Sequence, residues 1–306
     1  MCKNLAAFSF GCLLMIVLGV PAHAQQIADP HFNTRVENPA FSKSFPRVLF
    51  DEGHNNFDTP NNRYKPFADL IFNDGYHLVS NRQPFSKTSL ASYKILIIVN
   101  PLGAEDTDDE GADSPAFTAE ECDAVSDWVR SGGALLFIAD ATPFSSAAEI
   151  LAKKLGIEMS KGPAADLPNS EKESNEPGII VYSRENHLLA EDAITNGRSD
   201  AERVKRVAVF GGQSLKGPAE SSAFLKLADT AIADVSDTEK KLSAAGRAQG
   251  IALRLGKGRV VVLGDAAMLS AQLAGSDNQP VGMNVPNIDN RQLALNIMHW
   301  LSGLLK

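Results

Sequence analysis

Three short apolar runs, each ending at an aspartate, constrain the fold of this chain most strongly. They are Arg47-Val48-Leu49-Phe50-Asp51, Leu135-Leu136-Phe137-Ile138-Ala139-Asp140 and Val260-Val261-Val262-Leu263-Gly264-Asp265. Such runs are typical of strands buried on both faces of a parallel sheet. A fourth run, 94–99, is followed by Asn100. Because open α/β sheets bind ligands beyond the carboxyl ends of their strands, these polar ends predict one shared crevice.

The first 24 residues have the features of a secretory signal peptide. Lys3 precedes the apolar stretch 5–20, and Pro21-Ala22-His23-Ala24 supplies a small-residue cleavage site. The stretch is shorter than the roughly 20 apolar residues of a spanning helix, and no second one approaches that length. We therefore expect a periplasmic or secreted protein with no membrane span after cleavage. Residues 25–44 are expected to form an extended leader, and residues 45–306 a single domain.

Composition excludes some classes of structure and partner. Removal of the signal takes Cys2 and Cys12 with it and leaves Cys122, so no intramolecular disulfide can form. The domain must then be held by an ordinary core, which 44% apolar residues can supply. The net charge of −8, which becomes more negative when Lys3 is lost, excludes the basic surface that nucleic-acid binding needs.

The order of predicted elements indicates an α/β fold. Apolar spacing and capping signals predict helices over 62–73, 118–131 and 145–155 among strands over 47–51, 76–80, 94–100 and 134–139. This order favours a doubly wound, mostly parallel sheet. Further along, the sequence predicts an exposed loop over 159–175, strands over 178–182 and 204–210, a late β-hairpin over 250–263, and a closing helix over 290–304.

Four segments carry a resemblance to a known fold family. They are Asp51-Glu52-Gly53-His54-Asn55-Asn56, the segment 128–140, Gly256-Lys257-Gly258-Arg259-Val260, and the segment 296–301. Across 47–304 the chain resembles an uncharacterised bacterial family with a class I glutamine amidotransferase-like fold. That family is distantly similar to trehalose-utilisation proteins and to the amidotransferase-like domain of intraflagellar transport proteins. The resemblance implies a flavodoxin-like sheet and little about function.

The residues that a glutamine amidotransferase requires are missing from the matching turns. Such an enzyme carries a cysteine after the strand that 133–140 resembles and a histidine after the last strand. Here Asp140-Ala141 and Asp265-Ala266 stand at those turns, and Cys122 lies at the start of the preceding predicted helix. The chain is therefore not expected to be a glutamine amidotransferase, and whether it is another enzyme stays open.

The segment 51–58 is the densest group of candidate site residues. His54 could act as a general base or a metal ligand, with Asp51 or Asp58 orienting it, and Asp140 is a further catalytic candidate. Alternatively, Asp51 caps the following turn and the two asparagines bond loop amides. The predicted ligand-binding residues are Asp51, Glu52, His54, Asn55, Asn56, Asn100, Asp140, Asp265 and Gln272.

Two functions follow from these residues. The first is non-catalytic binding of a small polar ligand or of a cell-envelope partner. The alternative is a metal-assisted hydrolase acting on a polar substrate such as a sugar derivative, in which His54, Asp140 and Asp265 would hold a divalent cation. The two aspartates could instead be helix caps. Both functions predict that Asp51, His54, Asp140 and Asp265 converge in one pocket.

Overall fold

The computed structural model describes residues 26–171, 178–234 and 241–306. The predicted signal peptide, residues 1–24, lies outside the described residues. Within them, no helix has both the length and the apolar character needed to cross a bilayer.

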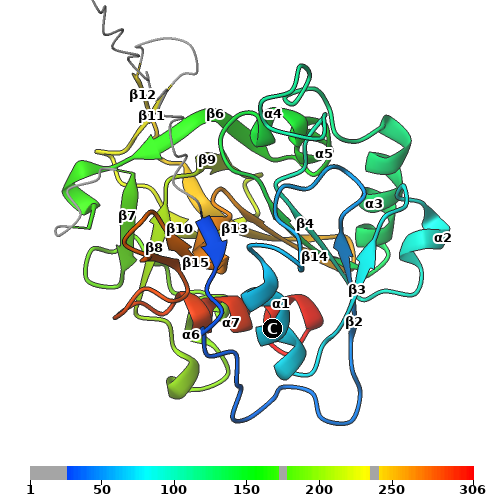
Figure 1. Ribbon diagram of the computed structural model, residues 1–306, viewed down its shortest axis with the longest axis horizontal. Coiled ribbons are helices and arrows are strands. Elements are labelled where there is room, and N and C mark those ends of the chain that lie inside the picture. Colours follow the sequence, from blue (N-terminus) through cyan, green and yellow to red (C-terminus); the bar gives the residue numbers. More distant parts are fainter. Residues whose placement is uncertain (1–25, 172–177, 235–240) are drawn as a thin grey trace, which may run out of the picture.

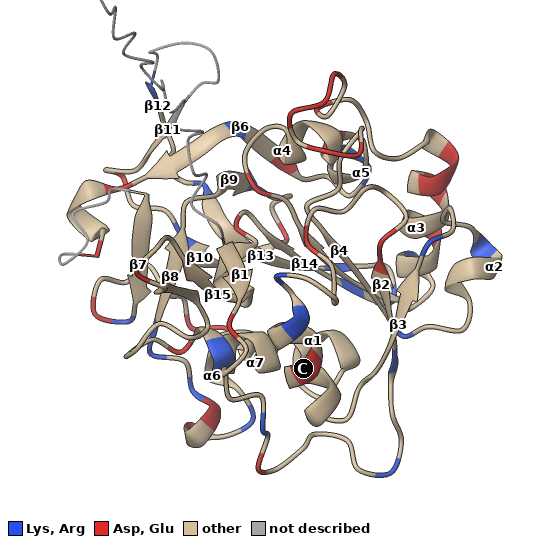
Figure 2. Ribbon diagram, viewed as in Figure 1, with Lys and Arg blue, Asp and Glu red and all other residues tan. Residues whose placement is uncertain are grey.

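A parallel half-sheet forms one end of the large sheet, on the right in Figure 1. Its five strands lie in the order β3-β2-β4-β5-β14, and every neighbouring pair in this order is parallel. Their bounds are β2 Arg47–Asp51, β3 His77–Asn81, β4 Ile95–Val99, β5 Ala134–Ile138 and β14 Gly258–Leu263. The four runs that end on polar residues therefore direct those residues to one edge of the sheet. Figure 2 shows acidic segments in the loops along that edge.

The rest of the large sheet is antiparallel, so the expectation of a mostly parallel sheet is wrong. The 11-stranded sheet continues from β14 through the predicted hairpin to β13 and then to β9, β6, β11 and β12, while β10 also pairs with β13. The bounds are β6 Glu158–Ala165, β9 Gln213–Lys216, β10 Ser222–Lys226, β11 Ile232–Asp234, β12 Lys241–Ser243 and β13 Ala248–Leu255. The sheet is mixed and not clearly doubly wound.

Strand β6 falls within the segment expected to be an exposed loop. It pairs with both β9 and β11, and these partners satisfy its backbone despite Pro163 and several polar side chains. The strand predicted over 178–182 is present as β7 Ile179–Ser183. It pairs with β8 Arg206–Phe210 in a separate two-stranded sheet.

A third, small sheet includes part of the expected leader. Its strands are β1 Gln26–Ala28, β15 Ala271–Ala274 and β16 Gln279–Gly282, in the order β1-β15-β16. Residues 29–38, called the leader segment below, then run toward the closing helix. Arg291 of that helix donates hydrogen bonds to the carbonyl oxygens of Asn33 and Arg35.

Helices cover both faces of the parallel half-sheet. Helices α1 Lys65–Asn73 and α7 Asn290–Ser302 pack on one face, and α2 Lys87–Leu90, α3 Ala119–Arg130 and α5 Glu149–Lys154 on the other. The short elements are α4 Phe144–Ala147, α6 Ala193–Asn196, η1 Leu167–Asn169, η2 Asp200–Glu202 and η3 Ala267–Leu269. Helix α3 begins with the predicted capping box between Thr118 and Glu121.

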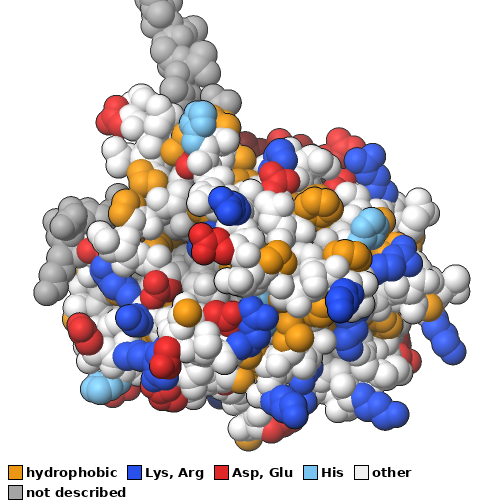
Figure 3. Space-filling view, turned by 90° about the horizontal axis from the view of Figure 1, so that it is seen from below, with side chains coloured by type: hydrophobic (Ala, Val, Ile, Leu, Met, Phe, Trp, Pro, Cys, Tyr) orange, Lys and Arg blue, Asp and Glu red, His pale blue; other side chains and the backbone are white. Residues whose placement is uncertain are grey.

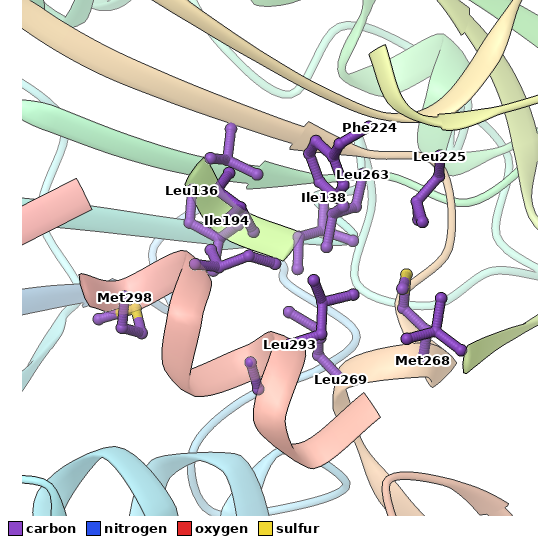
Figure 4. Packing of buried hydrophobic residues seen from close by; sticks show 14 of the residues in the cluster. Leu136, Ile138, Ile194, Phe224, Leu225, Leu263, Met268, Leu269, Leu293 and Met298 are labelled. Carbon is purple, nitrogen blue, oxygen red and sulfur yellow. The ribbon is translucent and has the colours of Figure 1, made fainter. Parts of the chain in front are cut away.

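Successive side chains along a strand point to opposite faces of the sheet, so each strand contributes to a core on both faces. In β5, Leu136 and Ile138 belong to the cluster beneath α7, whereas Leu135 and Phe137 belong to the cluster beneath α3. Figure 4 shows Leu136, Ile138 and Leu263 of the sheet beside Leu293 and Met298 of α7. Apolar burial on both faces fixes these strands and hence the positions of the polar residues that follow them.

Candidate functional site

Asn100 and Asp140 connect the carboxyl ends of two neighbouring central strands. The Asp140 amide donates to Asn100 Oδ1 (2.8 Å), and Asn100 Nδ2 donates to Asp140 Oδ2 (2.8 Å). Asn100 adopts a left-handed backbone with φ of 44°, a conformation that asparagine tolerates better than most residues. The pair therefore fixes the direction of the Asp140 carboxylate.

The same asparagine brings in a second carboxylate. Asn100 Nδ2 also donates to Asp58 Oδ2 (2.9 Å), and Asp58 is 3% exposed. The Asn100 carbonyl oxygen accepts from the amide of Phe57, which holds the loop after β2 against the loop after β4. Two aspartates thus share one amide donor inside the protein.

Asp265 follows β14 and is held by backbone amides. Its Oδ2 accepts from the amides of Phe210 (2.8 Å) and Met268 (3.2 Å), and its Oδ1 from Ala267 (3.1 Å). No α-helix follows it: the chain makes only the short 3-10 helix η3 and then enters β15, so Asp265 bonds the first amides of this 3-10 turn and caps no α-helix. The next amide, of Ala266, donates to Asp140 Oδ1 (2.7 Å).

Burial makes all three of these carboxyl groups weaker acids than an exposed aspartate. Burial, aided by the charge of Asp140, raises the pKa of Asp58 and of Asp265 to about 7 in each case. Burial also raises the pKa of Asp140. Positive charge on Arg63 lowers the pKa of both Asp58 and Asp140, but it does not offset burial. Near neutral pH the cluster therefore holds protons and gains charge readily when a cation approaches.

A cavity of about 880 Å³ opens over Asp140 and Asp265. Apolar side chains from three parts of the fold form much of its wall: Phe144, Ile179, Phe210, Pro280, Val281 and Val285. The described residues that line it include three carboxylates, Asp140, Glu171 and Asp265, and no lysine or arginine. Glu171 is paired with Arg206. The volume of the cavity lies in the range of small-molecule sites.

His54 lies in a different environment, with both ring nitrogens bonded to carboxylates. Nδ1 lies 2.8 Å from Asp51 Oδ2, and Nε2 lies 3.0 Å from Glu121 Oε1. The ring also packs against Phe85 and Phe117. Burial alone would lower the pKa of His54, but the bonds and charges of Asp51 and Glu121 raise it overall. With both nitrogens occupied, His54 has no free atom for general-base catalysis or metal binding.

Glu121 is the partner of His54 that the sequence did not indicate. Besides bonding His54, it accepts from the Phe85 amide (3.0 Å) and from the amide and hydroxyl of Thr118 (3.0 and 2.9 Å). Although burial raises the pKa of Glu121, these hydrogen bonds outweigh it and lower the pKa to about 2. The capping-box spacing is visible in the sequence, but His54 lies 67 positions earlier.

Of the other predicted ligand residues, Glu52, Asn56 and Gln272 are bonded to other groups of the protein. Glu52 accepts from Ser80 and Arg82, and Asn56 joins the His54 amide to the Val99 carbonyl oxygen. Asn55 is exposed, with a φ of 49°. Gln272 is buried in β15 and donates to Ser270 Oγ (2.6 Å).

The candidate residues therefore fall into two groups instead of one pocket. Asp58, Asn100, Asp140 and Asp265 meet at the ends of β4, β5 and β14, whereas Asp51 and His54 meet Glu121 and do not line the cavity. Across the described ranges, no three His, Cys, Asp or Glu side chains are arranged to hold a metal ion. The proposed ligand set of His54, Asp140 and Asp265 is thus not assembled.

Comparisons with known proteins bear on the fold alone. No protein-family model and no curated sequence matches the chain. Among solved structures, the mmIFT52 N-terminal domain, which has an amidotransferase-like fold, superposes with a TM-score of 0.60 at 16% identity, covering 83% of this chain and 97% of that domain. A ThuA-like protein from Parabacteroides merdae ATCC 43184 gives a TM-score of 0.45 at 11% identity, covering 86% and 91%. The first of these likenesses supports the amidotransferase-like architecture.

Proposed function

We propose that this protein is an exported, non-catalytic binding domain, and that the cavity over Asp140 and Asp265 binds a small polar ligand carrying a protonated amine. The choice of an amine as the ligand class rests on one observation. The cavity is lined by carboxylates without a lysine or arginine among its described lining residues, and its aspartates have raised pKa values. A cation placed there favours the ionised carboxylates, which burial and, at Asp265, the charge of Asp140 disfavour.

Hydrogen-bonding capacity also favours an amine. A carboxylate offers about four lone-pair sites, and Asp140 uses two of them on Asn100 and Ala266. The remaining sites can accept from an ammonium group. Phe144 and Phe210 supply apolar and aromatic surface on which the body of the ligand can pack.

Binding without catalysis is favoured by the chemistry of the available groups. The turn after β5 presents Asp140 and Ala141, neither of which is a thiol or hydroxyl nucleophile. Cys122 is buried in α3, and burial raises the pKa of its thiol to about 11, which keeps it protonated. The ring of His54 is committed to two carboxylates. Export rests on the sequence of residues 1–24.

Calorimetric titration with a primary amine and with the alcohol of the same shape tests this proposal. Cyclohexylamine should bind at pH 8 and cyclohexanol should bind at least about tenfold more weakly, a difference of about 1.4 kcal/mol. Asp140→Asn should remove the preference, and Val285→Trp should fill the cavity and abolish binding. Asp127→Asn, the same charge change on the exposed face of α3, should leave binding unchanged. Equal binding of amine and alcohol would refute the proposal.

A further inference from the structure

A second cavity, of about 890 Å³, lies between the leader segment and α7, away from Asp140 and Asp265. Leader residues such as Phe32 and Val36 form one wall, and Met283, Leu295 and His299 form another. Residues 198–202 close a third side. Figure 3 shows the molecule from below, on the side of α1 and α7, with acidic and basic side chains intermixed on that face.

His299 lines this cavity and keeps one buried ring nitrogen without a hydrogen-bond partner among the described residues. The side chain is 1% exposed, and Nε2 lies 2.8 Å from Asp74 Oδ2, so Nε2 carries the proton. In the neutral ring Nδ1 is then an acceptor. Nδ1 has no hydrogen-bond partner among the described residues, and Glu202 Oε2 is 4.0 Å away. A buried acceptor left in this state is costly unless something donates to it.

Asn284 also lines this cavity and contains a second buried acceptor without a partner among the described residues. Its Nδ2 donates to Asp29 Oδ2 (3.0 Å) and to the Gln272 carbonyl oxygen (2.9 Å). Two acceptor partners fix the amide orientation, so the free atom is the oxygen. That oxygen is buried and unpartnered within the described part of the chain. A ligand with hydrogen-bond donors at two places would therefore satisfy both acceptors.

Charged side chains of both signs line the cavity, the arginines at 35, 198 and 291 and the carboxylates at 29, 37, 74 and 202, and several of them are bonded within the protein. Arg198 forms a bidentate pair with Glu202, and Arg291 is bonded to the carbonyl oxygens of the leader segment. Asp74 is bonded to His299 and to the Ala40 amide. With three arginines against four carboxylates, the lining is close to balanced in charge and selects strongly for neither an anion nor a cation.

We propose that this cavity, enclosed by the leader segment and α7, is a second binding site for a neutral polyhydroxylated molecule of the sugar or polyol class. Hydroxyl groups donate to His299 Nδ1 and Asn284 Oδ1, and they also accept from donors on the wall. Phe32, Val36, Met283 and Leu295 pack against the carbon skeleton. The volume is sufficient for a mono- or disaccharide. This site is independent of the amine site proposed above.

Amide-resolved NMR titration tests the site with glucose and sorbitol as neutral probes, glucosamine as the cationic probe and gluconate as the anionic probe. Glucose or sorbitol should produce saturable shifts in residues 29–38 and in α7. Ala201→Trp places a large ring in the cavity from an exposed position and should weaken binding at least about tenfold. Ala91→Trp, an equal change at an exposed alanine of α2's end, should not.

Three outcomes would overturn the proposal. The neutral probes could produce no saturable shifts, which would mean that water alone satisfies the two acceptors. The shifts could persist in Ala201→Trp, which would place the binding elsewhere. Glucosamine or gluconate could bind more tightly than glucose, which would refute the ligand class. Asp140→Asn should leave sugar binding intact, so failure here and failure of the amine site are separable.

Discussion

Asn100 and Asp140 form a reciprocal pair, in which the Asp140 amide donates to Asn100 Oδ1 and Asn100 Nδ2 returns a bond to Asp140 Oδ2, both at 2.8 Å. Because Asn100 also bonds Asp58, this one buried amide organises two carboxylates. Asn100→Leu should remove all three bonds and leave buried acceptors and the Asp140 amide unpaired. We expect a loss of unfolding free energy of about 3 kcal/mol in urea titration. Asn61→Leu, at an exposed loop position, is the control, and an equal loss there would contradict the assignment.

Raised pKa values in the acidic cluster predict a specific pH dependence of stability. Asp58 and Asp265 have folded pKa values of about 7, above their unfolded value of 3.8. Between these values the folded chain binds more protons than the unfolded chain, so their contribution to stability falls as pH rises from about 4 to about 7. Asp58→Asn should flatten this fall by an amount on the order of 2 kcal/mol. Urea unfolding at pH 5 and pH 8 measures it, and identical slopes would refute it.

The pKa of His54 should fall when one of its two carboxylate partners is removed. The pKa of His54 is raised above 6.5, so its contribution to stability is complete below pH 6.5 and is lost as pH rises through the folded pKa. Glu121→Gln removes one of the two carboxylates and should lower the pKa of His54, which NMR of the ring protons can follow. It should also destabilise the fold by about 3 kcal/mol, since a buried pair is broken. The exposed neighbour provides the control, because Glu120→Gln should leave the His54 midpoint unchanged.

Gly211 and Gly212 are adjacent, Gly212 lines the cavity, and the two differ in the space that a side chain would meet. Gly211 and Gly212 both have positive φ, of 103° and 73°. A Cβ at Gly212 would clash with the carbonyl oxygen of Gly264 and lie 2.7 Å from the Asp265 Cβ, whereas a Cβ at Gly211 would meet nothing within 4 Å. Gly211→Ala should cost about 1 kcal/mol through backbone strain alone. Gly212→Ala should cost at least about 2 kcal/mol more and weaken amine binding, as thermal unfolding and calorimetry can show.

The parallel half-sheet could be predicted from the sequence because β2, β4, β5 and β14 are buried on both faces. Each of them is therefore an uninterrupted apolar run that can be recognised without knowing which strand it pairs with. It could not reveal β6, whose polar residues and proline depend on pairing with β9 and β11. For the site, the ends of β4, β5 and β14 were predicted to meet, and the structure brings Asn100, Asp140 and Asp265 into one neighbourhood. The partners that decide their chemistry come from distant segments: Phe210 donates its amide to Asp265 across 55 positions, and Glu121 occupies His54 across 67. Sequence spacing contains no signal for either contact.

A cationic ligand that binds over Asp140 and Asp265 should increase the negative charge of the acidic cluster. Calorimetry of cyclohexylamine binding near pH 7, in two buffers of different ionisation enthalpy, counts the protons exchanged. Because the pKa of Asp58 and of Asp265 is about 7 and a bound cation lowers it, we expect net proton release near pH 7 that falls to none by about pH 9, where the amine itself is still protonated. Binding with no proton exchange near pH 7, or with proton uptake by the complex, would contradict it.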